Sequence, residues 1–412
     1  MRVKPSARPI NRLRLGTFWV GSTSELSGLA ERASAIALFF AALAATLTIG
    51  FRDARLDYAY EFAVFLLAAY WSLAKRGGAM KRISDAPLFV ISIWGFLQLA
   101  FGATVYRFQT LQASLRFAAI AATAWISCRI FQSRRLRAAF LRAFACLGAA
   151  IAVISVIAYF TSPGKILWIF DAPYPDVWGP FLSRNNFAQF LELAFPVALW
   201  LAFRDSSVNV LYVSIASVLL ASGLASASRA GSIVLVLEAA AGLWMRRKSP
   251  VARKMALVLV VATGFFAAVA GIGNLAGRLA AHDPYQGRRE IAHSTLAMIA
   301  ARPWSGFGIG TFPTVYPAFA TFDTGQTVEH AHNDWLEWAS EGGVGFAAVW
   351  VVLALWSVGP AIRTGWGIGV LGCFLHALVD YPFARIGISA WIFILLGMLA
   401  ASELREVRRR VH

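Results

Sequence analysis

Two histidines, His330 and His332, stand in a polar segment late in an otherwise hydrophobic chain of 412 residues. A histidine can take a proton from a sugar hydroxyl because its pKa lies near neutral pH, so either is a candidate general base. In a regular helix, positions i and i+2 face different sides, so both cannot aim at one atom. Three acidic residues farther along could orient an imidazole: Asp334, Glu337 and Glu341. A metal is not expected, because neither a cysteine nor a third histidine stands beside this pair.

Arginines accompany several short polar motifs of the chain. Guanidinium groups keep their charge and donate two parallel hydrogen bonds, which suits a diphosphate whose lipid tail lies in a bilayer. The alternative is that each arginine simply extends from an apolar segment to the water interface. The candidates are Arg184, Arg229, Arg288 and Arg289.

A glycine-rich run, Gly306-Phe307-Gly308-Ile309-Gly310, follows Pro303. It resembles a nucleotide-binding loop only superficially, because no strand is expected before it. The run predicts a close backbone turn whose free N–H groups would be possible anion donors. Before it, residues 287–302 predict a short amphipathic helix with Ile291, Leu296, Met298 and Ile299 on its apolar side. After it, residues 329–340 are helical in pattern.

The elements that must position these residues are membrane helices. The chain is 58% hydrophobic and 14% charged, whereas soluble domains carry about 25% charged residues. Apolar runs of about 18–22 residues can cross a hydrocarbon core of about 30 Å. An all-α polytopic membrane protein with about twelve spans is expected, at 34–51, 58–75, 86–105, 111–131, 138–160, 187–204, 209–226, 230–245, 255–274, 343–360, 367–381 and 387–403.

The net charge of +17 has a topological explanation that needs no nucleic acid. If the spans alternate sides from an internal N-terminus, 24 of the 38 Lys and Arg fall inside, 11 outside and 3 within spans. Positive residues accumulate in cytoplasmic segments, so both termini are expected inside and residues 275–342 outside.

Ionisable residues inside predicted spans are expensive and often functional. His376 and Asp380 are four positions apart in the eleventh span, near the outer face, and form a second tier of site candidates. The sequence does not separate function from helix pairing for the others, which are Glu61, Arg116, Arg142, Glu192 and Glu238.

The order of these motifs resembles the bacterial O-antigen ligase and O-antigen polymerase superfamily. The resemblance covers residues 180–345, and the remaining spans match only as hydrophobic helices. Its elements are Arg184-Asn185-Asn186-Phe187-Ala188 with Pro196, Ser228-Arg229, Gly287-Arg288, Pro303-x-x-Gly306-x-Gly308-x-Gly310-x-Phe312, His330-Ala331-His332-Asn333-Asp334-x-Leu336 and Glu341-Gly342-Gly343.

The resemblance implies a polytopic (GT-C-like) glycosyltransferase of the bacterial inner membrane. It would move a glycan from undecaprenyl diphosphate to an acceptor hydroxyl, on a lipid A-core sugar or a growing polysaccharide, without metal or cofactor. His332 becomes the expected base and His330 the alternative. The expected binding residues are Arg184, Arg229, Arg288, Arg289, Asn185, Asn333 and Asp334.

The implied organisation is a basic cytoplasmic N-terminus (1–33), nine spans (34–274), a periplasmic catalytic loop (275–342), three spans (343–403) and a cytoplasmic tail (404–412). Polymerisation of an O-antigen or exopolysaccharide and protein O-oligosaccharyl transfer remain alternatives of the same chemistry. A polysaccharide transporter or flippase is the competing class. Transporters concentrate their ionisable groups near the midplane and often contain inverted repeats, whereas here the informative polar groups lie in one loop.

Overall fold

The computed structural model describes residues 18–51, 53–74, 85–173, 176–204, 209–248, 256–261, 263–264, 268, 286–321, 325 and 327–411. Within these residues helix predominates, as expected. The strands described are a short hairpin of β1 (Lys165–Ile166) and β2 (Phe170–Asp171), paired antiparallel.

The helices follow the apolar runs of the sequence. The first half contains α1 (Phe18–Leu47), η1 (Ile49–Phe51), α2 (Ala54–Leu73), α3 (Asp85–Ala100), α4 (Arg107–Ile130), α5 (Arg134–Thr161), α6 (Arg184–Phe203), α7 (Val210–Ala225) and α8 (Arg229–Met245). The second contains α11 (Gln286–Ala301), α12 (Phe312–Val315), η2 (Tyr316–Ala318), α13 (Asp334–Thr364), α14 (Ile368–His376), η3 (Pro382–Ala384) and α15 (Ile386–Val411).

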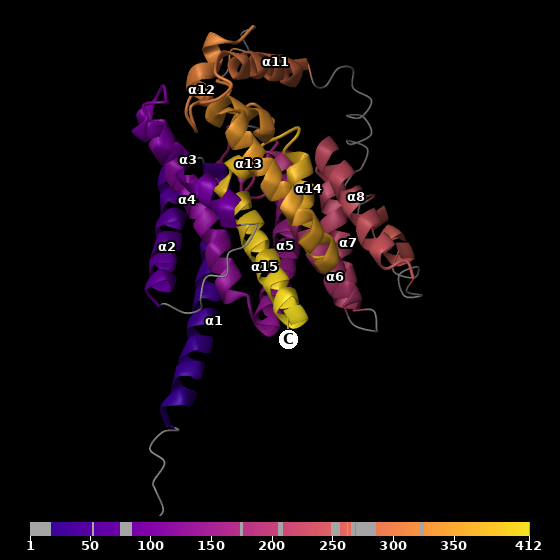
Figure 1. Cartoon of the computed structure of the whole chain (residues 1–412). Helices are drawn as coiled ribbons and strands as arrows, with labels where there is room; N and C mark the ends of the chain where they lie inside the picture. Colours follow the sequence, from indigo (N-terminus) through magenta and orange to yellow (C-terminus); the bar gives the residue numbers. More distant parts are fainter. Residues whose placement is uncertain are drawn as a thin grey trace, which may run out of the picture.

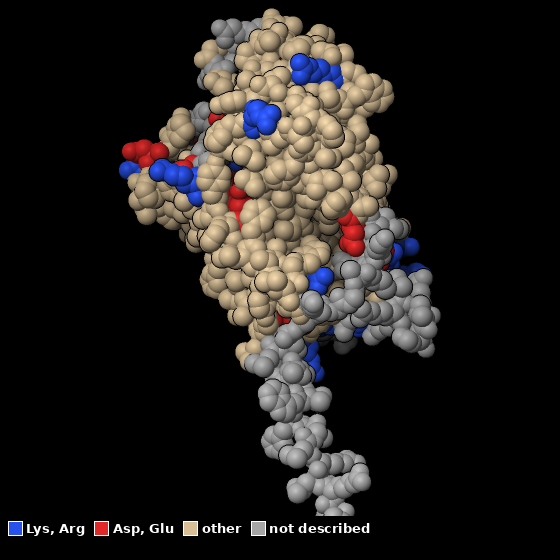
Figure 2. All heavy atoms as spheres, turned by 60° about the vertical axis from the view of Figure 1, so that its left-hand side comes forward, with Lys and Arg blue, Asp and Glu red and all other residues tan. Residues whose placement is uncertain are grey.

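By length and composition, five described helices can cross a membrane, so this is a multi-pass helical membrane protein. They are Gly28–Phe51, Arg134–Thr161, Arg184–Phe203, Asp334–Thr364 and Ile386–Leu404. Two shorter helices, α3 and α7, are also apolar. Most of the surface on the face in Figure 2 carries no Lys, Arg, Asp or Glu, as a lipid-facing surface requires.

The count of twelve spans stays a prediction, and two of the twelve need comment. The ninth, 255–274, lies largely outside the described residues. The eleventh, 367–381, differs in the structure: α14 has nine residues and is about 14 Å long, well short of the hydrocarbon core. Residues 377–385 leave the helix and form an irregular segment that includes η3.

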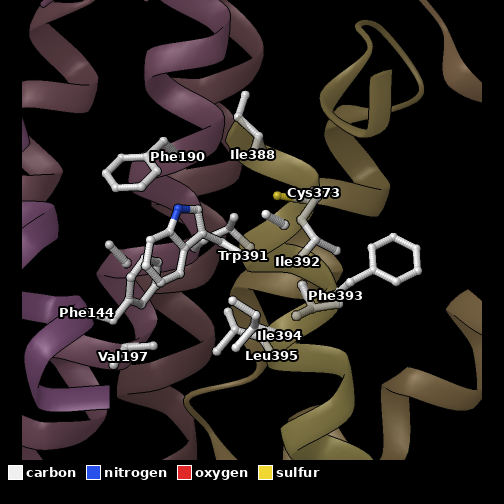
Figure 3. Close-up of a cluster of buried hydrophobic side chains, with 14 of the residues drawn as sticks. Phe144, Phe190, Val197, Cys373, Ile388, Trp391, Ile392, Phe393, Ile394 and Leu395 are labelled. Atoms are coloured by element: carbon white, nitrogen blue, oxygen red, sulfur yellow. The ribbon is translucent and has the colours of Figure 1, made fainter. Parts of the chain in front are cut away.

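The centre of the bundle is formed by α6 and α15. In their most apolar stretches, 94% and 89% of the residues are buried, against 33–39% in α1, α5 and α13. Trp391 of α15 stacks on Phe144 of α5, with ring centroids 4.5 Å apart, and meets Phe190 of α6 edge-on (Figure 3). Its indole N–H donates to the hydroxyl of Thr46 at 2.8 Å, which satisfies the polar edge of a buried ring.

Helix α13 is broken at Gly343, whose φ of +81° is open to glycine but strained for other residues. Trp338 before the break stacks on Trp350 after it, at 3.9 Å between centroids, and Phe383 meets both rings edge-on. The break therefore joins a short segment, 334–342, to the long apolar part of the same helix through one aromatic cluster.

Residues 286–321, here called the cap, lie across one end of the bundle. Figure 1 shows α11 and α12 at that end, while the N-terminal half of α1 and the end of α15 lie at the opposite end. The amphipathic helix predicted for 287–302 is confirmed as α11, and its Ile291 and Met298 are buried. Leu296 was placed wrongly on the buried side: it is 52% exposed, because Ser294 and Thr295 occupy the inner face at these turns.

Candidate functional site

The centre of the candidate site is Asp380, in the irregular segment between α14 and α15. Its backbone N–H donates to the carbonyl of His376 at 3.0 Å, and its side chain is 2% exposed. The two residues were expected on one helix, but α14 ends at His376. The segment turns away because Pro382 follows, and the residue before a proline disfavours helical geometry.

The carboxylate of Asp380 joins side chains from three distant parts of the chain. Oδ1 lies 3.4 Å from Nδ1 of His332 and accepts from the N–H of Tyr381 at 3.0 Å. Oδ2 accepts from Nδ2 of Asn185 and lies 3.6 Å from a guanidinium nitrogen of Arg288. The sequence-predicted residues Asn185, Arg288 and His332 are therefore brought together by this one carboxylate.

The Asp380 carboxylate is held ionised by its neighbours. Burial alone would raise its pKa, but the hydrogen bond with His332 and the charge of Arg288 outweigh burial and lower the pKa to about 2. The site thus carries a fixed negative charge between a guanidinium and an imidazole.

The N-termini of three helices are tied together at this network. Ser183, Ser228 and Asn333 are the N-caps of α6, α8 and α13, and each accepts a backbone N–H of the first turn. The hydroxyl of Ser228 also donates to Oδ1 of Asn185 at 2.8 Å, which joins α8 to α6. Because helix N-termini carry partial positive charge, this convergence favours an anionic ligand.

Neither histidine is helical, although residues 329–340 were expected to be. The helix begins only at Asp334, and His332 has a φ of +50° in the loop before it. Because neither residue is helical, the two imidazoles are not forced to opposite sides of a helix. They flank Tyr381: the ring of His330 stacks on it at 4.4 Å and that of His332 meets it at 5.1 Å.

Each histidine has its own carboxylate. Nδ1 of His330 lies 2.9 Å from Oε1 of Glu337, whose other oxygen accepts the N–H of Ala331 at 2.7 Å. His332 faces Asp380 instead. The His332 side chain is 32% exposed and that of His330 is 18% exposed, so His332 is the more accessible imidazole.

The predicted arginines differ in what they contact. Arg288 of α11 donates to the carbonyl of Val379 at 2.8 Å in addition to facing Asp380. Arg184 forms an ion pair with Asp176 and adjoins Asn185 in the chain. Arg229, which follows the Ser228 cap, is half-buried, and Arg289 is exposed. Arg288 thus contacts the Asp380 network directly.

Asn333 and Asp334, predicted to bind substrate, make contacts within the protein. Asn333 caps α13 through Oδ1 and donates through Nδ2 to the carbonyl of Leu378 at 2.8 Å. Asp334 is 2% exposed, and its Oδ2 accepts the N–H of Phe383 at 3.1 Å. The two residues fix the Asp380 segment on both of its flanks.

The expectation that the glycine-rich turn presents free N–H groups is wrong. The N–H groups of Gly310 and Phe312 both donate at 2.8 Å to the carboxylate of Glu341. Gly308 donates to the Glu341 carbonyl at 2.9 Å, and Ile309 donates to the side chain of Gln98 at 3.0 Å. Through these hydrogen bonds the turn attaches the cap to α13 and α3.

Asp380 and Tyr381 were both predicted to lie inside the eleventh span. Pro382 is the local signal against that prediction, since helices usually end at or before the residue that precedes a proline. Of the remaining histidines of the 275–342 segment, His293 is exposed on α11 and His282 lies outside the described residues.

Comparison with protein families supports the motif resemblance. Residues 213–351 match the family model described as O-antigen ligase. The matched range includes Arg229, Arg288, both candidate histidines and the glycine-rich turn, and it ends before Asp380. No curated protein matches the chain.

Proposed function

Because the O-antigen ligase match confirms the resemblance to the O-antigen ligase and polymerase superfamily, we propose that this protein transfers a glycan from undecaprenyl diphosphate to an acceptor hydroxyl. The observation that carries the proposal is the Asp380 carboxylate, which joins a candidate base, His332, to a candidate phosphate ligand, Arg288. Proton removal and leaving-group stabilisation are the two tasks that this reaction requires.

His332 is the proposed general base. With the Nδ1 proton shared with Asp380, the lone pair of Nε2 points away from the carboxylate and can accept the proton of the acceptor hydroxyl. A buried carboxylate in this position also stabilises the imidazolium that forms, as in hydrolase triads. The acceptor oxygen then attacks the anomeric carbon. The bond between that carbon and the diphosphate oxygen breaks, and the configuration at the carbon inverts.

Arginine charge and helix N-termini serve the leaving group. Negative charge grows on the diphosphate as the glycosidic bond breaks, and fixed positive groups stabilise it without reorganising. Arg288 is held beside the base by Asp380 and Val379. Arg184 and Arg229 begin α6 and α8, whose N-termini meet through Asn185 and Ser228. Together these groups form the proposed diphosphate site.

We place this site on the periplasmic side of the inner membrane, with both chain termini in the cytoplasm, in a GT-C-like arrangement of about twelve spans. The distribution of Lys and Arg along the sequence supports that orientation. The position of the cap, at the end of the bundle opposite the last residues of α15, is compatible with it (Figure 1).

The proposal is tested by purified protein, purified lipid-linked glycan donor and three acceptors in parallel. The acceptors are lipid A-core, a glycan with a free non-reducing end, and an acceptor peptide with serine or threonine. Formation of glycan product with one acceptor supports transfer and separates ligase, polymerase and protein-glycosylating activities. Movement of the intact donor across a vesicle membrane, with no product from any acceptor, would instead establish a flippase.

The diphosphate site has its own measurement. Arg288→Ala is expected to weaken donor binding and transfer strongly, and Arg288→Lys to restore them only in part, because an ammonium lacks the two-pronged geometry. Arg302→Ala, which removes an arginine from the same cap, provides the control. Equal donor binding by wild type and Arg288→Ala would remove Arg288 from the diphosphate site.

A further inference from the structure

A pocket lies between the later turns of α6 and α8, the end of α13 and the start of α14. Its volume is about 230 Å³, below the roughly 300–1,000 Å³ of pockets that hold drug-sized molecules. Its lining combines apolar side chains, among them Leu199, Trp200, Phe203, Met245 and Ile368, with the polar Glu238, Arg246, Arg363 and Thr364. Its size suits a lipid headgroup.

The buried polar group of this pocket is Glu238. The side chain is 3% exposed, and within the described part of the chain neither carboxylate oxygen has a hydrogen-bond partner. Oε1 lies against Gly372 of α14, where a Cβ atom would overlap it. A buried carboxylate without partners is strongly unfavourable when ionised, so it calls for a ligand that donates hydrogen bonds.

The mouth of the pocket has the opposite charge. Arg246 follows the last turn of α8, and Arg363 lies in the last turn of α13, where it pairs with Glu403 at 3.4 Å. Both arginine side chains are exposed. Glu403 offsets one arginine, and the positive charge that remains would repel a simple cation on its way to Glu238 and attract a phosphate. A ligand that satisfies both parts of the pocket therefore carries an ammonium group and a phosphate a few bonds apart.

We propose that this pocket binds the headgroup of an aminophospholipid, phosphatidylethanolamine. Its primary ammonium donates to the Glu238 carboxylate, and its phosphate contacts the arginines at the mouth. Exposed apolar side chains on α8 and α13, such as Val236, Leu237 and Leu355, offer surface for the acyl chains. A quaternary choline headgroup has no N–H to donate, and a glycerol headgroup has no positive charge, so both should bind less well. This inference is independent of the proposed transfer reaction.

The test uses the full-length protein, purified in detergent and stripped of lipid. Phosphatidylethanolamine, phosphatidylcholine and phosphatidylglycerol with identical acyl chains are added in turn, and retention is measured by native mass spectrometry together with the shift in melting temperature. The ethanolamine lipid is expected to bind at least about tenfold more tightly than the other two. Glycerophosphoethanolamine, which lacks acyl chains, distinguishes a soluble headgroup from a lipid: saturable binding of that compound alone would overturn the lipid assignment.

Two variants locate the site. Glu238→Gln should abolish the preference for the ethanolamine lipid, whereas Glu61→Gln, which alters a buried carboxyl of α2 outside the pocket, should keep it. If Glu238→Gln does not fold, Arg246→Gln at the exposed mouth provides the second measurement and should weaken retention of the ethanolamine lipid. Equal retention of all three lipids by wild type, an unchanged preference in Glu238→Gln, or undiminished retention of the ethanolamine lipid by Arg246→Gln would overturn the proposal.

Discussion

Nδ1 of His332 lies 3.4 Å from Oδ1 of Asp380, although the two residues are 48 positions apart in the chain. The left-handed backbone at His332, with φ of +50°, turns its side chain toward that carboxylate. The Asp380 carboxylate at Nδ1 fixes the orientation of the His332 ring and leaves Nε2 available to accept a proton. Asp380 is therefore a positioning residue in the proposed reaction.

Asp380→Asn should therefore reduce glycan transfer by roughly 10²-fold or more, the scale of acid–base catalysis. Asparagine keeps the shape but removes the charge, so the imidazolium and the guanidinium both lose their anion. Transfer is measured with purified lipid-linked donor, and donor binding separately. Asp171→Asn in the exposed hairpin is the matched control and should transfer normally. Full transfer by Asp380→Asn would exclude the carboxylate from the mechanism.

The same carboxylate makes a prediction about stability and pH. The pKa of Asp380 is about 2, below its ordinary value of 3.8, so ionised Asp380 stabilises the folded state. That contribution, on the order of 2 kcal/mol, is complete above about pH 4 and is lost as the pH falls toward 2. Melting temperatures of wild type and Asp380→Asn in detergent should thus differ at pH 6 and converge between pH 4 and pH 2. A gap that stays constant over this range would contradict the proposed charge state.

Much of the fold could be predicted because its signals are local. An apolar run of membrane length can satisfy its backbone in lipid as a helix, so α1, α5, α6 and α15 follow from composition. Helix α11 follows from its periodicity and from Pro303. The same reasoning misplaced Leu296, because small polar residues on the inner face of α11 interrupt the apolar stripe: Thr295 satisfies its own hydroxyl by donating to the carbonyl of Ile291 at 2.7 Å.

The candidate site could be predicted only in part. Short motifs drew attention to Arg288, His332 and Asn185, but nothing local says that one carboxylate joins them. Asp380 comes from a segment whose sequence continues an apolar helix, and its side-chain partners His332 and Asn185 lie 48 and 195 positions away. The role of Glu341 could not be predicted for the same reason. Its carboxylate oxygens accept hydrogen bonds from the glycine-rich turn about thirty residues earlier, and these bonds form only once α13 and the cap have packed.

The glycine-rich turn supplies the third prediction. Gly308 has φ of +110°, and a Cβ atom there would overlap Thr104 and lie 2.8 Å from the hydroxyl of Thr110. Gly102 also has positive φ, +67°, but has open space around it. Gly102→Ala should cost about 1–2 kcal/mol, the ordinary penalty of left-handed backbone, whereas Gly308→Ala should destabilise the protein more and loosen the cap. Thermal unfolding and limited proteolysis within residues 286–321 measure both effects, and equal behaviour of the two variants would argue against the packing role.

The last prediction separates the two histidines. A general base needs a neutral nitrogen within reach of the acceptor hydroxyl, whereas a positioning histidine needs shape and one hydrogen bond. His332 is more exposed and shares Asp380 with Arg288; His330 stacks on Tyr381 and pairs with Glu337. His332→Gln should therefore keep expression and donor binding but lose transfer by about 10²-fold or more, while His330→Gln should lose less. Normal transfer by His332→Gln together with a large loss in His330→Gln would move the base to His330 and its Glu337 partner. Normal transfer by both variants would end the histidine mechanism and leave the arginine-lined site to act on the leaving group alone.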